Sequence, residues 1–445
     1  MNSRRQAAFI VARWIATGEY PAEMLPQGPD RAFVQDLVYT TVRRFRPLRK
    51  VLGELVAKWP KGELEALLLV GGAQILYMPD VPDFAAVNET VSAAKCCANK
   101  SIAKVVNGTL RNLIRRREEF ETKLAAAPLA ERESYPNALV RRWTERYGAE
   151  KAEALAKWHN QPAETWLAYR ECKIENVECR MKDAECKILH SPFSILHSTF
   201  VRLARGQRVT EADGYAEGAF VVQDPATALA VELLDVKPGQ SVLDFCAAPG
   251  GKTAQIAWRL MENVECKMEN GSRLVAQEVN PARLRRLREN LARLHLDWVE
   301  TTEDVKTAPG SPHSGDGRTA PVSPHSGDGR TVFGQFDRVL VDVPCSNTGV
   351  LRRRPDARWR WTEDRLTSLA ALQDEILSAA AAYVAPGGKL VYSTCSNEPE
   401  ENADRVAAFL SSHPDFAEIA RRESLPYESG HDGAFACALV RRERT

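Results

Sequence analysis

Apolar and polar positions change their spacing partway along the chain. From residue 1 to about 125, apolar residues recur three and four positions apart, as in 7–15, 31–45, 64–78 and 85–97. This spacing places apolar side chains along one face of an α-helix. The region 1–125 is therefore predicted to be an all-helical domain.

From about residue 216 onward, short apolar runs alternate with helical patterns. The predicted strands of this region are 241–246, 273–279, 336–343, 389–395 and 434–442. Such alternation of strands and helices is typical of a largely parallel sheet covered by helices. We predict that 216–445 forms a Rossmann-like α/β domain.

The region 126–215 between them has a mixed pattern. Helical spacing runs from 139 to 160, and strand-like runs follow at 165–171 and 218–224. We predict a linking α/β subdomain here, interrupted by a low-complexity insertion near 171–188.

Three segments look like insertions. The polar string near 171–188 has a relative near 261–272, and 306–331 holds a tandem repeat rich in Pro, Gly, Ser and Asp. Such compositions offer few apolar groups to bury. The first insertion also has evenly spaced cysteines, but zinc ligands usually come as close Cys pairs with a fourth ligand, so we expect no metal. These cysteines are Cys172, Cys179 and Cys186.

Charge and hydropathy limit which partners and which cellular compartment we expect for this protein. The 60 Lys and Arg residues nearly balance the 59 Asp and Glu residues, giving a net charge of +1. Any contact with nucleic acid must therefore be local. Basic residues gather at 42–50 and 110–117, either as solvated helix faces or as phosphate contacts. No run is long and apolar enough to span a bilayer, so we expect no membrane association and a cytoplasmic protein with reduced thiols.

Candidate chemistry gathers where three predicted strands end. Cys345 and Cys395 each follow a short apolar run, and VLDFCAAPGGKT leads from a strand through a Gly-rich turn into a helix. Cys246 stands where a P-loop requires glycine, which argues against triphosphate binding. Glu278, at the end of the next strand, is suited to bind ribose hydroxyls. We predict a nucleotide-type cofactor pocket beside two thiols.

In combination, CAAPGGKT (246–253), DVPCSNTGV (342–350) and YSTCSNEPEEN (392–402) resemble the Sun-family RNA cytosine-5 methyltransferases. The strings RAFVQDLVYTTVRR and KVVNGTLRNLIRR resemble the NusB-like helical RNA-binding domain that precedes the catalytic part in RsmB-type enzymes. Those enzymes act on bacterial small-subunit ribosomal RNA.

The resemblance implies a cofactor, S-adenosyl-L-methionine, and a set of residues that bind it. Glu278 stands where the family usually has Asp, and the sequence around Asp304 matches the family's Gly-Asp turn only loosely. The implied cofactor-binding residues are Cys246, Ala247, Ala248, Pro249, Gly250, Gly251, Lys252, Glu278, Asp304 and Asp342.

The resemblance also implies catalytic roles. Cys395 would add to C6 of a cytosine in 16S rRNA, because a thiol adduct turns C5 into a carbon that can accept a methyl group. Cys345 would assist release, and Asp342 would lie where cofactor and base meet. The family's chemistry on tRNA or large-subunit rRNA is an alternative, as is a non-catalytic RNA-binding assembly factor. The sequence specifies no oligomeric state.

An Arg- and Trp-rich stretch at 351–361 directly follows the Cys345 motif. Guanidinium groups bind phosphates and aromatic rings stack on unpaired bases, so we predict RNA contacts here. A helix start with solvated arginines is the alternative. The predicted RNA-binding residues are Arg352, Arg353, Arg354, Arg358 and Trp359.

Overall fold

The computed structural model describes residues 2–97, 100–170, 198–204, 206–261, 271–303 and 334–443. The predicted insertions near 171–188, 261–272 and 306–331 lie almost wholly outside these described residues, as do the three evenly spaced cysteines of the first insertion.

The chain forms two compact units. Unit 1 comprises Met1–Pro162 and Leu351–Thr362, and unit 2 comprises Ala163–Val350 and Glu363–Thr445. This division differs from the predicted ranges 1–125, 126–215 and 216–445. The helices between residues 126 and 162 belong to the first unit, and so does the short segment 351–362 that follows the Cys345 motif.

Unit 1 is helical, and its main helices lie where the spacing of apolar residues predicted them. Their inward faces form one core that includes Leu37, Leu68 and Leu110, all with no exposed surface. The elements are α1 (Ser3–Thr17), η1 (Pro21–Met24), α2 (Arg31–Arg43), α3 (Phe45–Gly53), α4 (Glu63–Tyr77), α5 (Asp83–Cys97), α6 (Lys100–Arg115), α7 (Arg117–Ala125), α8 (Leu129–Arg132), α9 (Asn137–Tyr147), α10 (Ala149–Asn160) and α15 (Ala357–Arg360).

The region 139–160 is two helices rather than the single predicted one. Gly148 separates α9 from α10 with φ +83°, a conformation that residues with a side chain rarely adopt. The apolar spacing continues across the break, which is why the pattern alone did not reveal it.

Unit 2 is built on a seven-stranded sheet with strand order β6-β5-β4-β7-β8-β10-β9. The first five strands in this order pair in parallel, and β10 pairs antiparallel with both β8 and β9. The strands are β4 (Ser241–Asp244), β5 (Arg273–Gln277), β6 (Glu300–Thr302), β7 (Phe336–Asp342), β8 (Val384–Thr394), β9 (Phe416–Ser424) and β10 (Ala434–Arg441).

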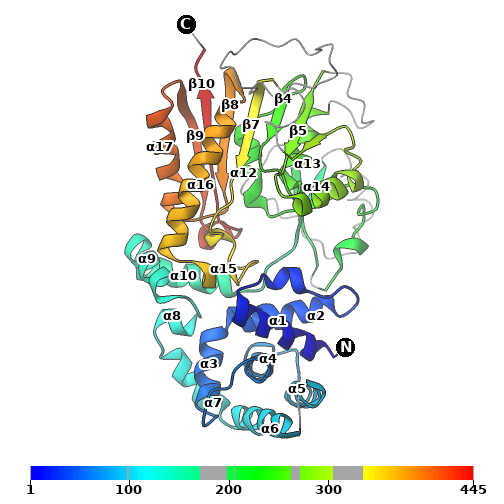
Figure 1. Ribbon diagram of the computed structural model, residues 1–445, viewed down its shortest axis with the longest axis vertical. Coiled ribbons are helices and arrows are strands. Elements are labelled where there is room, and N and C mark those ends of the chain that lie inside the picture. The colour runs from blue at the N-terminus through cyan, green and yellow to red at the C-terminus, as the bar shows by residue number, and fades with distance from the viewer. Residues whose placement is uncertain are drawn as a thin grey trace. The chain divides into compact units, whose positions relative to one another are not determined.

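Helices cover both faces of this sheet, as the predicted Rossmann-like domain requires (Figure 1). One core joins α12, α13 and α14 to side chains such as Val242 and Leu274, and the other joins α16 and α17 to the neighbouring Leu243 and Val275. Alternate residues of each strand therefore point into opposite cores. The helices and turns of unit 2 are η4 (Val209–Glu211), η5 (Pro225–Thr227), α12 (Ala228–Leu234), α13 (Gly251–Leu260), α14 (Pro281–Arg293), η6 (Thr348–Val350), α16 (Glu363–Ala381), η7 (Pro399–Glu401), α17 (Ala403–Ser412) and α18 (Pro426–Ser429).

Two strands of this sheet were not predicted. β9 has the sequence FAEIARRES, in which charged residues are as many as the apolar ones, and β6 is only three residues long. Both lie at the edges of the sheet, where solvent reaches one side of the strand. Edge strands carry a weak apolar signal for that reason.

Unit 2 also contains a small antiparallel sheet of order β2-β1-β3, made of β1 (Trp166–Arg170), β2 (Ser198–Arg202) and β3 (Phe220–Val222). β1 and β3 confirm the strands predicted at 165–171 and 218–224. Leu167, Tyr169 and Phe220 pack in a separate small core behind it.

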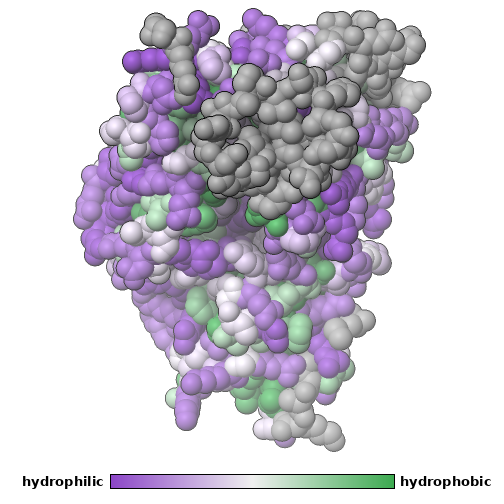
Figure 2. Space-filling model, turned by 45° about the horizontal axis from the view of Figure 1, so that its top comes forward, coloured by the Kyte–Doolittle hydropathy of each residue, from purple (hydrophilic) through white to green (hydrophobic). Residues whose placement is uncertain are grey.

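In the part of the chain that the structure describes, no helix is both long and apolar enough to cross a membrane. The face drawn in Figure 2 is largely hydrophilic, with apolar residues in small separate patches.

Candidate active site

The residues singled out by the sequence meet at one edge of the unit 2 sheet. β4, β5, β7 and β8 run parallel, so their carboxyl ends lie along the same edge. Cys246 follows β4, Glu278 follows β5, Asp342 ends β7 and Cys395 follows β8. The chain also reverses its direction of winding between β4 and β7, the place where α/β sheets bind ligands.

The Gly-rich turn leads from β4 into α13. Gly250 caps the helix with φ +102°, and its N–H donates to the carbonyl oxygen of Ala247 at 2.8 Å. A Cβ on Gly250 would lie 2.8 Å from Cδ1 of Leu287. Glycine is thus required by both backbone conformation and space, and the N-terminus of α13 faces the edge where the other site residues lie.

Asp244 ends β4 beneath this turn and is 1 % exposed. Thr253 Oγ1 donates to its Oδ2 at 2.7 Å, whereas its Oδ1 has no hydrogen-bond partner among the described residues. Burial raises the pKa of Asp244 to about 7, the Thr253 hydrogen bond works against this shift, and the nearby Asp342 adds to it. The free oxygen is suited to a ligand that donates a hydrogen bond.

Lys252 and Asp342 form an ion pair across the turn. Lys252 Nζ lies 2.5 Å from Asp342 Oδ2, and Ser393 Oγ donates to Asp342 Oδ1 at 2.7 Å. Burial works to lower the pKa of Lys252, but the Asp342 carboxylate outweighs it and the pKa is raised. Lys252 therefore remains an ammonium group, and it also interacts electrostatically with Cys395.

Glu278 is 3 % exposed and is held at the end of β5. Its Oε1 accepts a hydrogen bond from the Asn280 N–H at 3.0 Å, and Oε2 lies 3.3 Å from Arg283 Nη2. Arg283 also donates to the carbonyl oxygen of Ala248 at 3.0 Å. This arginine, which the sequence did not single out, ties Glu278 to the Gly-rich turn. Asp304 lies outside the described residues.

Cys246 has a different environment from the other two thiols of the site. Burial, with help from Asp244 and Asp342, raises the pKa of Cys246 to about 12. A thiol in this state is a poor nucleophile.

Cys345 and Cys395 lie side by side, 50 residues apart in sequence, with their Sγ atoms separated by 3.1 Å. The pKa of Cys345 is raised well above its ordinary value, first by its hydrogen bond to Cys395, then by burial and by the nearby Cys395 and Glu401. The Cys345 thiol thus keeps its proton and can share it with the sulfur of Cys395.

Asn347 joins the two cysteine loops. Cys395 Sγ lies 3.5 Å from Asn347 Oδ1, and Asn347 Nδ2 donates to the Cys345 carbonyl at 2.9 Å. Asn347 has φ +63°, a conformation that asparagine tolerates better than most residues. Two residues later, a Cβ on Gly349 would lie 2.8 Å from the Cys395 carbonyl oxygen and 2.7 Å from that of Gly433, so the loops touch backbone to backbone.

The stretch predicted to bind RNA lies in unit 1, and several of its side chains contact other residues of that unit. Arg352 donates to the Pro162 carbonyl at 2.6 and 2.9 Å and stacks over Trp158. Trp359 Nε1 donates to the Val42 carbonyl at 3.0 Å, and its ring packs edge-on against Phe45. These contacts hold the segment within the helical unit.

Arg358 has no exposed surface. Its Nη1 donates to Asn160 Oδ1 at 2.9 Å and to the Ser134 carbonyl at 3.3 Å, and its guanidinium lies 4.0 Å from the Tyr135 ring centroid. The prediction that Arg358 contacts RNA does not fit this burial. Arg354 is exposed and Arg353 half-buried, so these two are the members of the set best placed to meet a phosphate.

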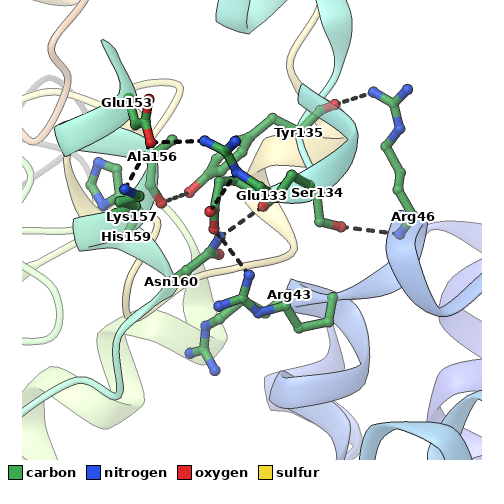
Figure 3. Close-up of polar contacts among 12 residues, drawn as sticks. Arg43, Arg46, Glu133, Ser134, Tyr135, Glu153, Ala156, Lys157, His159 and Asn160 are labelled. Atoms are coloured by element: carbon green, nitrogen blue, oxygen red, sulfur yellow. Dashed lines mark hydrogen bonds and ion pairs between the residues drawn. The ribbon is translucent and has the colours of Figure 1, made fainter. Parts of the chain in front are cut away.

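Figure 3 shows the polar network of unit 1 near this arginine. Asn160 Nδ2 donates to the Glu133 carboxylate at 2.9 Å and to its carbonyl at 2.8 Å, and the Tyr135 hydroxyl donates to the Ala156 carbonyl at 3.0 Å. Asn160 therefore presents its amide oxygen to Arg358 in a fixed orientation.

The basic runs 42–50 and 110–117 are also partly neutralised inside unit 1. Arg44 pairs with Glu133, Lys50 with Glu131, and Arg116 with Glu54 and Glu119. Their contact with RNA stays a prediction.

Among the described residues, no group of three or more His, Cys, Asp or Glu side chains is arranged to hold a metal ion.

Comparison with known proteins agrees with both units. The family described as "16S rRNA methyltransferase RsmB/F" matches residues 231–434, and the NusB family matches residues 1–115. The ribosomal RNA small subunit methyltransferase B of Serratia proteamaculans is 33% identical, over 99% of each chain, and that of Vibrio vulnificus is 32% identical, over 99% of this chain and 100% of its own.

Solved structures share the fold. The crystal structure of PH0851 covers 100% of this chain and 99% of its own, with 22% identity and a TM-score of 0.74. That of NSun6 from Pyrococcus horikoshii with SFG covers 69% of this chain and 99% of its own, with 19% identity and a TM-score of 0.55. The full-length relatives, the two family matches and the shared fold show that this chain belongs to the RsmB/F family of 16S rRNA methyltransferases, with a NusB-type helical unit before its Rossmann-like catalytic unit.

Proposed function

We propose that the protein transfers a methyl group from S-adenosyl-L-methionine to C5 of a cytosine in 16S rRNA, through a covalent adduct between Cys395 and C6 of the base. The observation that carries this proposal is the pair of thiols 3.1 Å apart, beside the Lys252–Asp342 ion pair and the Gly-rich turn. Membership of the family supports methyl transfer, and the names of the full-length relatives support small-subunit rRNA as the substrate.

The residues at the sheet edge fit the proposed cofactor. The unpartnered Oδ1 of Asp244 and the N-terminus of α13 would hold the amino and carboxylate groups of its methionine end. Glu278 would accept hydrogen bonds from ribose hydroxyls. The bound cofactor would supply an electrophilic methyl group between these residues and the two thiols. Asp304 stays a predicted contact on its adenine side.

The two thiols would have different roles. Cys395 would act as a thiolate, favoured by the ammonium of Lys252 and by a hydrogen bond from Cys345. Its sulfur would form a bond to C6, which makes C5 nucleophilic enough to take up the methyl group. A base must then remove the C5 proton before the Cys395–C6 bond breaks, and Cys345 would assist that release.

Asp342 would lie where cofactor and target base meet. Its carboxylate is fixed by Lys252 on one side and by Ser393 on the other. A carboxylate in this position can accept a hydrogen bond from the exocyclic amino group of cytosine. The target base must enter unpaired or flipped, because a thiolate adds to C6 from above the ring plane, where neighbouring bases stack in a helix.

Substitution of each cysteine tests the assignment. Cys395→Ala should abolish methylation and form no covalent RNA adduct. Cys345→Ala should still attack the base but release it slowly, so a protein–RNA species that survives denaturing electrophoresis should accumulate. Bisulfite sequencing of 16S rRNA after incubation with the wild type locates the methylated cytosine.

Other outcomes lead to the other candidate functions. A Cys395→Ala enzyme that still methylates would refute the proposed nucleophile. Methylation of tRNA or large-subunit rRNA, but not 16S rRNA, would keep the chemistry and change the substrate. If the wild type binds rRNA but transfers no methyl group, the chain is a non-catalytic assembly factor.

A further inference from the structure

Each of the two site cysteines is followed by a serine, and both serines bind the same buried carboxylate. Ser346 follows Cys345, Ser396 follows Cys395, and Glu401 lies in the η7 turn with no exposed surface. The Ser346 N–H donates to Glu401 Oε1 at 2.7 Å, and its hydroxyl donates to Oε2. The Ser396 hydroxyl also donates to Oε2. One side chain therefore joins both cysteine loops.

Glu401 is held in the interior by neutral donors. Gln373 Nε2 donates to its Oε1 at 3.1 Å and also to the Pro344 carbonyl at 2.9 Å, one residue before Cys345. Among the described residues, no lysine or arginine forms an ion pair with this carboxylate. A buried anion without a cation is costly unless several hydrogen bonds satisfy it, and four donors do so here.

Two further contacts fix the turn that carries Glu401. The Tyr392 hydroxyl donates to the Glu401 carbonyl at 2.6 Å, and Thr394 Oγ1 donates to Asn402 Oδ1 at 2.6 Å. Both donors lie on β8, the strand that ends just before Cys395. The carboxylate therefore has little freedom to move relative to the Cys395 loop. Because Ser346 binds the same carboxylate, the Cys345 loop is held at a fixed distance from the Cys395 loop.

Besides fixing the spacing of the two loops, the Glu401 carboxylate affects the protonation of Cys345. Glu401 is one of the groups that raise the pKa of Cys345. This negative charge therefore disfavours a second anion at Cys345.

We propose that Glu401 is a positioning residue for methyl transfer, which holds the two Cys-Ser loops at their working separation and biases the shared thiol proton toward Cys345. This inference rests on the proposed function of the two cysteines. Glu401 contacts the two cysteine loops through Ser346 and Ser396, and its charge acts on Cys345 through space.

The test is Glu401→Gln, which keeps the size of the side chain but removes its charge and one acceptor. We expect kcat to fall about tenfold to a hundredfold, since small displacements of reacting groups cost that much, while KM for S-adenosylmethionine changes little. In parallel, iodoacetamide labelling of each cysteine is followed across pH by mass spectrometry. Cys345 should become reactive at lower pH in Glu401→Gln than in the wild type.

A matched control removes a nearby charge without touching either serine. Asp404 is exposed on the first turn of α17, three residues after Glu401, so Asp404→Asn should leave kcat and the labelling profile of Cys345 unchanged. Ser346→Ala and Ser396→Ala each remove one donor to the carboxylate and provide milder variants if Glu401→Gln does not fold. Each should lower kcat by about fivefold, which corresponds to about 1 kcal/mol of hydrogen bonding.

The outcomes separate this inference from the proposed function. A Glu401→Gln enzyme with wild-type kcat would overturn the positioning role, and an unchanged pH profile of Cys345 labelling would overturn the proton bias. The labelling experiment needs no RNA. If the wild type fails to methylate any RNA, the function in the preceding section fails, whereas a shifted Cys345 profile in Glu401→Gln still supports the charge effect.

Discussion

At the scale of single residues, Asp244 links the stability of unit 2 to pH. Its pKa is raised from 3.8 to about 7, chiefly by burial. Between about pH 4 and pH 7, the folded protein therefore holds a proton that the unfolded chain has lost. The unfolding free energy should fall as pH rises through this window, by at most roughly 4 kcal/mol for three pKa units at ~1.4 kcal/mol each.

Replacing Asp244 by Asn should remove this dependence. We expect Asp244→Asn to melt close to the wild type at pH 5 and at a higher temperature than the wild type at pH 8, because only the wild type then buries a charge. Differential scanning calorimetry at both pH values measures the difference. Asp297→Asn, an exposed site, is the control and should show no such gap. A difference between Asp244→Asn and wild type that does not change with pH would contradict the raised pKa.

Gly250 is the second residue at which a single change has a defined consequence. Valine there would have to adopt φ +102° and would press its Cβ against Leu287, 2.8 Å away. The Gly-rich turn must then shift, so calorimetry should show S-adenosylmethionine binding weakened tenfold or more, about 1.4 kcal/mol or greater. Gly108→Ala, where a Cβ meets nothing within 4 Å, should bind as the wild type does. Equal affinity for Gly250→Val and wild type would remove this turn from the cofactor site.

At the scale of elements, the segment 351–362 connects the two units, because it leaves the Cys345 loop of unit 2 and folds as part of unit 1. Arg358 is its anchor. Arg358→Met should leave Asn160 Oδ1 and nearby carbonyl oxygens without their buried donor and should destabilise unit 1 by about 3 kcal/mol. Hydrogen exchange should become faster in α10, where Asn160 lies, and in α9, which packs against α10, and stay unchanged in β4 and β7.

The matched control for this prediction lies in the same segment. Arg354 is exposed, so Arg354→Met removes an equal charge without opening the buried network and should leave exchange in α9 and α10 unaltered. Exchange rates that respond equally to both substitutions would show that the net charge of the segment, and not the Arg358 network, stabilises the helices.

The same segment shows what sequence patterns can and cannot reveal. The strands that end at Asp244, Asp342 and Thr394 were predictable, because apolar runs and a Gly-rich turn are local signals. The burial of Arg358 was not, because an arginine in an Arg-rich run looks solvated until its distant partners are known. Glu401 stood within the motif that carried the family resemblance, but its role depends on two serines in different loops. Contacts between distant segments leave no periodic trace in the sequence.

At the scale of the whole molecule, the chain passes between the two units three times, at 162/163, 350/351 and 362/363. A cut at 162/163 alone therefore does not separate two complete folding units. The fragment 163–445 would carry a segment whose Leu351, Ala357 and Arg358 are at most 3 % exposed in the full chain. The fragment 1–162 would lack the residues that complete its core.

Limited proteolysis of the separated fragments tests this interdependence. In 163–445 alone, trypsin should cut rapidly at Arg358 and Arg360, because the helices that bury them are absent. Co-expressed 1–162 should protect those sites and co-purify with 163–445, since the segment supplies the Arg358 anchor and the Trp359 ring to the helical core. Cleavage at Arg285 and Arg286, exposed on α14, serves as the control and should be equal in both preparations. If the segment resists trypsin equally without 1–162, its order arises within unit 2, and the helical unit is not needed to hold the chain that leads out of the Cys345 loop.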